Sequence, residues 1–217
     1  MPQIAIFDLD GTLLDTGKGI RNSVKYAENQ MGLLPLNDDE LNKFVGPAPR
    51  DSYMRYHNLS HETAKEAVRL HREYSKMRGI YEAETYEGIK TILGWLKSKG
   101  IMLAVATLKR EDLAIKILDH FNLSGYFNEI CGTDIQESLT KIDLVRLVLQ
   151  RTKCIAEQAV MIGDTEQDHH AANACNIKFI GVTYGYGYHS ESQLFYQAAN
   201  GEQLTACLGR ALDIQIY

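Results

Sequence analysis

Apolar residues along this chain follow two alternating patterns. Short apolar runs without polar alternation predict strands that are buried on both faces. We expect these strands over Ile4–Phe7, Met102–Ala106, Ala159–Ile162 and Phe179–Val182. Longer segments between them repeat apolar residues at helical spacing. We expect these helices over Gly88–Lys99, Asp112–Phe121 and Leu139–Gln150. This alternation favours an α/β fold with a Rossmann-like parallel sheet core flanked by helices.

Residues 17–84 differ from the rest, because apolar runs of strand type are nearly absent there. Asn37, followed three residues later by Glu40, is typical of a capping box at a helix start. Ser60 precedes a second helical pattern and suits an N-cap. We therefore predict two domains: a discontinuous core of residues 1–16 and 85–217, and an inserted, small, all-helical domain of residues 17–84.

Composition narrows the class of protein. The chain has 217 residues, 45% of them hydrophobic, which is enough for a sizeable core. Its formal net charge of -5 argues against a nucleic acid polymer as partner. The four cysteines are widely spread and form no C-x-x-C pair, so we expect reduced thiols. We find neither a signal-peptide pattern nor a membrane-length apolar run, and we expect a cytoplasmic protein with no membrane partner.

Aspartates follow two of the predicted strands. Asp8 and Asp10 come directly after the first strand, and Asp164 and Asp168 come after the strand at Ala159–Ile162. Carboxylates crowded at strand ends repel one another unless a cation lies between them. Mg²⁺ is the expected cation because it prefers oxygen ligands.

The segment Phe-Asp-Leu-Asp-Gly-Thr-Leu at residues 7–13 resembles motif I of the haloacid dehalogenase superfamily. The segment Gly-Asp-x-x-x-Asp at residues 163–168 resembles its motif IV, and the helical insert resembles the cap of the phosphoglycolate phosphatase-like branch. The resemblance implies that Asp8 is the nucleophile and Asp10 the general acid and base. It also implies that Asp8, Asp10, Asp164 and Asp168 hold Mg²⁺, with Asp164 binding directly.

Two further motifs are identified mainly by their order in the chain. Thr107 ends a predicted strand and matches motif II, whose hydroxyl binds the phosphoryl group. Leu108 stands where many relatives have Asn or Gly, so only its backbone N–H is expected to contact phosphate. Lys141 matches motif III, whose cation neutralises nucleophile and phosphate. Lys109 either adds charge near the site or lies on an exposed loop.

Other candidate residues have two interpretations. Gly46–Arg50 is a proline-stiffened segment ending in a cation. Arg50 either pairs with a second anionic group of the substrate or caps the following helix. His169 and His170 invite a metal hypothesis, but packing on the helix is the better interpretation because zinc sites need more ligands.

The resemblance implies a Mg²⁺-dependent phosphatase that hydrolyses a small phosphate monoester through an aspartyl-phosphate, similar to phosphoglycolate phosphatase. The alternative is a 5'-nucleotidase-type nucleoside monophosphate phosphatase. A sugar-phosphate mutase and a non-catalytic binding protein on the same scaffold are further alternatives. We expect a small phosphorylated metabolite as partner and a monomer or homodimer.

Overall fold

The computed structural model describes residues 3–136, 138–188, 194 and 196–215. The chain divides into two compact units. The core unit consists of Met1–Leu14 and Thr85–Tyr217, and the helical unit consists of Asp15–Glu84. Two short strands, β2 (Leu14–Asp15) and β3 (Glu84–Thr85), pair where the chain passes between the units.

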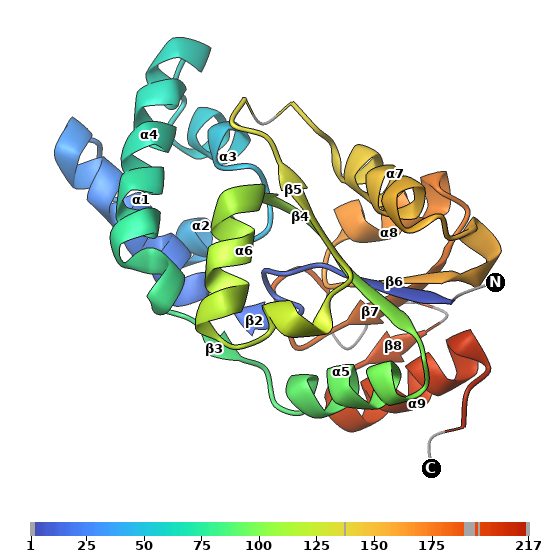
Figure 1. The fold of residues 1–217 in the computed structure, drawn as a ribbon. Coiled ribbons are helices and arrows are strands. Elements are labelled where there is room, and N and C mark those ends of the chain that lie inside the picture. The colour runs from blue at the N-terminus through green and yellow to red at the C-terminus, as the bar shows by residue number, and fades with distance from the viewer. Residues whose placement is uncertain (1–2, 137, 189–193, 195, 216–217) are drawn as a thin grey trace. The chain divides into compact units, whose positions relative to one another are not determined.

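The core unit is built on a parallel sheet with the strand order β5-β4-β1-β6-β7-β8 (Figure 1). Its strands are β1 (Ile4–Phe7), β4 (Met102–Arg110), β5 (Glu129–Thr133), β6 (Ala159–Gly163), β7 (Lys178–Val182) and β8 (Gln197–Ala198). The predicted parallel α/β core is confirmed, and β1 lies in its centre with all four residues buried. Because all strands run in parallel, their carboxyl ends share one edge of the sheet.

Sequence alone did not identify β5 and β8. Strand β5 has only two strongly apolar residues, Ile130 and Cys131, between Glu129 and Gly132. It forms the edge of the sheet beside β4. An edge strand needs less apolar surface than a central one, and its pairing with β4 is a long-range contact that local pattern does not encode.

Helices cover both faces of the sheet (Figure 1). They are α5 (Ile89–Ser98), α6 (Glu111–His120), α7 (Lys141–Thr152), α8 (Glu166–Ala174) and α9 (Gly201–Leu212), with 3₁₀ turns η2 (Ser124–Tyr126) and η3 (Ala156–Gln158). Leu144 and Val148 of α7 and Ala171 of α8 share one hydrophobic cluster with Ile4 and Ile6 of β1. Side chains along a strand point to the two faces of the sheet in turn. Residues an even number of positions from Ile4 and Ile6 therefore face α7 and α8.

The helical unit contains α1 (Gly17–Met31), α2 (Asp38–Asn42), α3 (Pro49–Tyr56), α4 (His61–Met77) and the 3₁₀ turn η1 (Gly79–Tyr81). The predicted caps are present: Asn37 and Glu40 form a capping box, and Ser60 accepts from the backbone of Thr63. Helices α1 and α4 pack together, and the unit buries Tyr53 and other apolar side chains of its own.

Two further expectations concern cysteines and membranes. All four cysteines are free thiols in the structure. Among the described residues, no helix combines the length and apolarity that a membrane span requires.

Candidate active site

The site begins where β1 ends. The Asp8 backbone N–H donates to the carbonyl of Ile162 at 2.9 Å, so the sheet pairing continues one residue past Phe7. Asp8 lies two residues after Ile6, and its side chain therefore points to the same face of the sheet, which carries α7 and α8. Its carboxylate is almost fully buried there.

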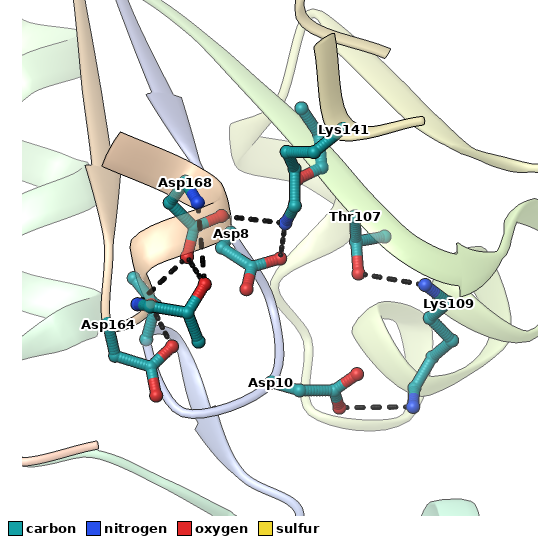
Figure 2. A network of polar contacts seen from close by, with 10 residues as sticks. Asp8, Asp10, Thr107, Lys109, Lys141, Asp164 and Asp168 are labelled. Carbon is teal, nitrogen blue, oxygen red and sulfur yellow. Dashed lines mark hydrogen bonds and ion pairs between the residues drawn. The ribbon is translucent and has the colours of Figure 1, made fainter. Parts of the chain in front are cut away.

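Lys141, the first residue of α7, supplies the cation. Thr140 and Asp143 form a capping box that fixes the start of this helix. The Lys141 Nζ lies 2.7 Å from Asp8 Oδ1 and 2.8 Å from Asp168 Oδ1 (Figure 2). It also donates to the carbonyl of Ala106 at 3.2 Å. A buried ammonium with three oxygen partners is fixed in place, and it bridges two acidic residues from different motifs.

Asp168 lies in the first turn of α8 and has no exposed surface. Its Oδ2 accepts from the Thr165 hydroxyl at 2.6 Å and from the Thr165 N–H at 3.1 Å. The other oxygen, Oδ1, faces Lys141. The capping box of α8 therefore orients Asp168 toward the ammonium.

Asp164 follows β6 and completes an acidic group. Asp8, Asp164 and Asp168 each offer an oxygen, and these oxygens lie within 4.8 Å of one another. When all three are ionised, the carboxylates carry three negative charges, and Lys141 offsets one of them. The remaining charge and the set of oxygen donors fit a hard divalent cation such as Mg²⁺.

Burial dominates the electrostatics of this group. It raises the pKa of Asp8 from 3.8 to about 8, against the pull of Lys141 and with added repulsion from Asp168 and Asp164. Burial and then the charge of Asp168 raise the pKa of Asp164 to about 6. Burial by itself would lower the pKa of Lys141, but Asp168 and Asp8 raise it, so the ammonium stays charged. The group therefore has an excess of negative charge that favours binding either a proton or a metal.

Asp10 lies outside the acidic group of three. Its Oδ1 is 3.0 Å from the Nζ of Lys109, and both side chains are largely buried (Figure 2). The backbone N–H of Lys109 also donates to the Thr107 hydroxyl at 3.1 Å. Lys109 thus links Thr107 and Asp10. Leu108, between Thr107 and Lys109, is half-buried.

Arg50 belongs to the helical unit, where it is half-buried. Pro49 and Arg50 form the first turn of α3, so the segment before the helix ends at Ala48. His169 stacks on Phe179, with ring centroids 4.8 Å apart and planes 11° apart. His169 thus packs on a side chain of β7, and the next residue, His170, is exposed.

Sequence reasoning left two parts of the site undecided. The sequence favours Lys109 equally as a charge at the site and as an exposed cation. In the structure it contacts Asp10, and it lies where the pairing of β4 with β5 shifts register, between Thr107 and Arg110. The segment after Val182 is the second part, and it is rich in glycine and tyrosine. In the structure, its Tyr186 and Gly187 N–H groups donate to Asp164. The glycines were the available signal, since glycine permits close approach of backbone to a neighbouring group.

The chain matches known proteins over most of its length. The family model of haloacid dehalogenase-like hydrolases matches residues 5–182. The crystal structure of a predicted phosphatase from Clostridium acetobutylicum is 38% identical and has a TM-score of 0.88, covering 94% of this chain and 97% of that chain.

Three curated relatives are named for different activities. Tyrosine-protein kinase PtkA of Mycobacterium tuberculosis is 36% identical over 86% of this chain, and the match spans 64% of the length of PtkA. A 5'-nucleotidase of Pseudomonas aeruginosa is 35% identical, covering 87% of this chain and 85% of that protein. A phosphoglycolate phosphatase of Aquifex aeolicus is 32% identical, covering 85% of this chain and 86% of that protein.

We predict that metal-free protein loses stability as the pH rises. The pKa of Asp8 is higher in the folded than in the unfolded chain, so folding retains a proton that unfolding releases. This contribution is complete below about pH 4 and is lost by about pH 8. Urea unfolding in chelator should show a falling free energy of unfolding over this range. Mg²⁺ at 100 times its Kd should add about 2.7 kcal/mol near pH 8.

The control for this prediction is Asp8→Asn, which removes the raised carboxyl pKa. Its free energy of unfolding should depend less on pH than that of the wild-type chain. Equal pH dependence in the two proteins would contradict the assignment of the shift to Asp8.

Proposed function

Because the chain belongs to the haloacid dehalogenase-like hydrolase family, we propose that it is a phosphatase that hydrolyses a small phosphate monoester through an aspartyl-phosphate on Asp8. The observation that carries this proposal is the buried contact of Lys141 with Asp8 and Asp168, with Asp164 beside them. The phosphatase and nucleotidase among the relatives support the same reaction class.

The proposed reaction has two halves. In the first, a carboxylate oxygen of Asp8 attacks phosphorus, the bond from phosphorus to the ester oxygen breaks, and Asp10 gives a proton to the departing alcohol. In the second, Asp10 takes a proton from water as the water oxygen attacks phosphorus. Inorganic phosphate leaves and the Asp8 carboxylate is regenerated.

The remaining residues offset charge on the phosphoryl group. Lys141 holds the Asp8 carboxylate in a fixed direction, and Thr107 offers a buried hydroxyl in the carboxyl half of β4. The backbone N–H of Leu108 is a further candidate donor. Preorganised donors of this kind are worth more in a buried site than in water.

Asp8, Asp164 and Asp168 are the residues that would hold Mg²⁺. Asp10 stays a further proposed ligand outside this group, and its Oδ1 lies 3.0 Å from the Nζ of Lys109. When bound, Mg²⁺ supplies positive charge next to the phosphoryl oxygens.

The proposed substrate is a small acidic monoester such as phosphoglycolate, and the second candidate is a nucleoside 5'-monophosphate, favoured by the 5'-nucleotidase relative. We propose that the helical unit, as the cap, selects the substrate and that Arg50 pairs with a second anionic or polar group. Release of phosphate from a panel of phosphorylated metabolites tests the class and ranks the substrates.

PtkA supports a different second function, phosphoryl transfer to a protein tyrosine. The two functions differ in the acceptor, which is water for a phosphatase and a hydroxyl for a kinase. Release of inorganic phosphate from small esters without any protein substrate favours the phosphatase. Labelling of tyrosine from ATP without such release favours the kinase.

Asp8→Asn should lower kcat at least about a thousandfold, because the amide lacks the attacking oxygen charge. Asp10→Asn should still form the phosphoryl-enzyme slowly and should accumulate it, which mass spectrometry after acid quench detects. Asp119→Asn, on the exposed surface of α6, is the matched control and should retain activity. Retained turnover in Asp8→Asn, with deamidation excluded, would refute the covalent route.

Removal of metal should abolish phosphate release, and Mg²⁺ should restore it. Ca²⁺ should restore little activity, because it takes more ligands at longer distances than Mg²⁺. The measurement is the rate of phosphate release in chelator before and after each ion is added. Full activity in excess chelator would rule out the metal.

Arg50→Ala should raise the KM for the best acidic metabolite about tenfold or more, the usual cost of a charge-assisted hydrogen bond. The KM for a small aryl phosphate without a second anionic group should change little. Arg55→Ala, an exposed cation on the same helix, is the control. Equal losses for both substrates would show that Arg50 is structural.

A further inference from the structure

The segment after β7 surrounds the carboxylate of Asp164. Within Thr183–Tyr188, the backbone N–H groups of Tyr186 and Gly187 donate to Asp164 Oδ2 at 2.7 and 3.3 Å. The N–H of Tyr188 donates to the Asp164 carbonyl at 2.8 Å. This segment therefore holds both the side chain and the backbone of Asp164.

The other carboxylate oxygen of Asp164, Oδ1, accepts a hydrogen bond from the segment at residues 7–13, which also contains Asp8. The Thr12 hydroxyl donates to Asp164 Oδ1 at 3.3 Å, and Thr12 has no exposed surface. The hydroxyl of Tyr184 in turn donates to the Thr12 carbonyl at 3.0 Å. The Tyr184 ring packs on the ring of Tyr86, with ring centroids 4.6 Å apart. Tyr184 thus supports Asp164 through Thr12.

Two glycines make room for this arrangement. A Cβ built on Gly185 falls closer than 3.0 Å to the Gly11 carbonyl and to the Asp164 carboxylate. A Cβ built on Gly11 also falls closer than 3.0 Å to that carboxylate. Real Cβ atoms essentially never approach so closely. At residue 185 the need for glycine is steric, and any side chain there displaces Asp164 or Gly11.

We propose that Tyr184, Gly185 and the N–H groups of Tyr186 and Gly187 are positioning residues that fix Asp164 for metal binding. This inference rests on the proposed function, because that function places Mg²⁺ on Asp164. A carboxylate has about four lone-pair positions, and the three donors found among the described residues leave one for a metal. Mg²⁺ demands nearly ideal geometry, so a freely rotating carboxylate binds it less well than one held in place.

The test measures metal affinity directly on the full chain, by calorimetry with Mg²⁺ and by electron paramagnetic resonance with Mn²⁺. Gly185→Ala should weaken binding of both ions about 10- to 100-fold, the usual loss when groups supporting a metal ligand are changed. Tyr184→Phe should weaken it about 2- to 10-fold, the range for one hydrogen bond. Because the ligands themselves remain, excess Mg²⁺ should restore kcat in both variants.

Two matched controls test whether the effect is local. Gly94→Ala adds a Cβ on α5 whose nearest neighbour is 4.0 Å away. Tyr26→Phe removes a hydroxyl that donates to Glu73 in the helical unit at 2.9 Å. Both controls should bind metal as the wild-type chain does. If Gly185→Ala does not fold, Tyr184→Phe carries the test, since the phenyl ring keeps its shape.

The outcomes separate the inference from the function on which it rests. Wild-type protein that binds neither ion would overturn the metal site and the inference with it. Binding by the wild-type chain with unchanged affinity in Gly185→Ala and Tyr184→Phe would overturn the inference alone. Weaker binding in both variants, restored activity at high Mg²⁺ and unchanged controls would support it.

Discussion

The buried ammonium of Lys141 is the interaction on which this site depends. It lies within 2.8 Å of carboxylate oxygens from Asp8 and Asp168, and all three side chains are withdrawn from water. Removing one partner from a buried ion pair typically costs about 3–5 kcal/mol, because an uncompensated charge remains. Asp164 adds a further buried carboxylate, and the resulting excess of negative charge favours binding of either a proton or a metal. The site therefore holds its charged side chains in fixed positions and has an excess of negative charge.

The parallel sheet makes this arrangement possible. Asp8 and Asp164 directly follow β1 and β6, and Thr107 lies in the carboxyl half of the adjacent strand β4, before its pairing with β5 shifts register. Helices α7 and α8 begin at the same edge, and the positive end of a helix dipole favours carboxylates there. Capping boxes at Thr140 and Thr165 set where these helices start. Local sequence signals thus place Lys141 and Asp168, and the sheet brings them to Asp8.

The core and the helical unit have different parts in the proposed function. Relatives named as a kinase, a nucleotidase and a phosphatase match nearly the same share of this chain, 85–87%. Proteins with different substrates therefore share this framework, and the phosphoryl chemistry that we propose belongs to residues of the core. For this reason we propose that the helical unit selects the substrate. Asp8 is accordingly tested by its effect on kcat, and Arg50 by its effect on the KM of two substrates.

The sequence by itself determined the parts of this protein that local pattern encodes. The buried central strands, the caps at Asn37 and Ser60, and the acidic motifs around Asp8 and Asp164 can all be read from residue type and spacing. Apolar periodicity and turn chemistry act over a few residues, so no tertiary information is needed for them.

Only the tertiary structure decided which groups meet. It pairs Asp10 with Lys109, and it adds β5 to the sheet edge. It also folds the segment after β7 around Asp164, 22 residues distant from Tyr186 in the sequence. These contacts join residues that are far apart in the chain. Their energies depend on distance and burial, which exist only once the sheet has formed.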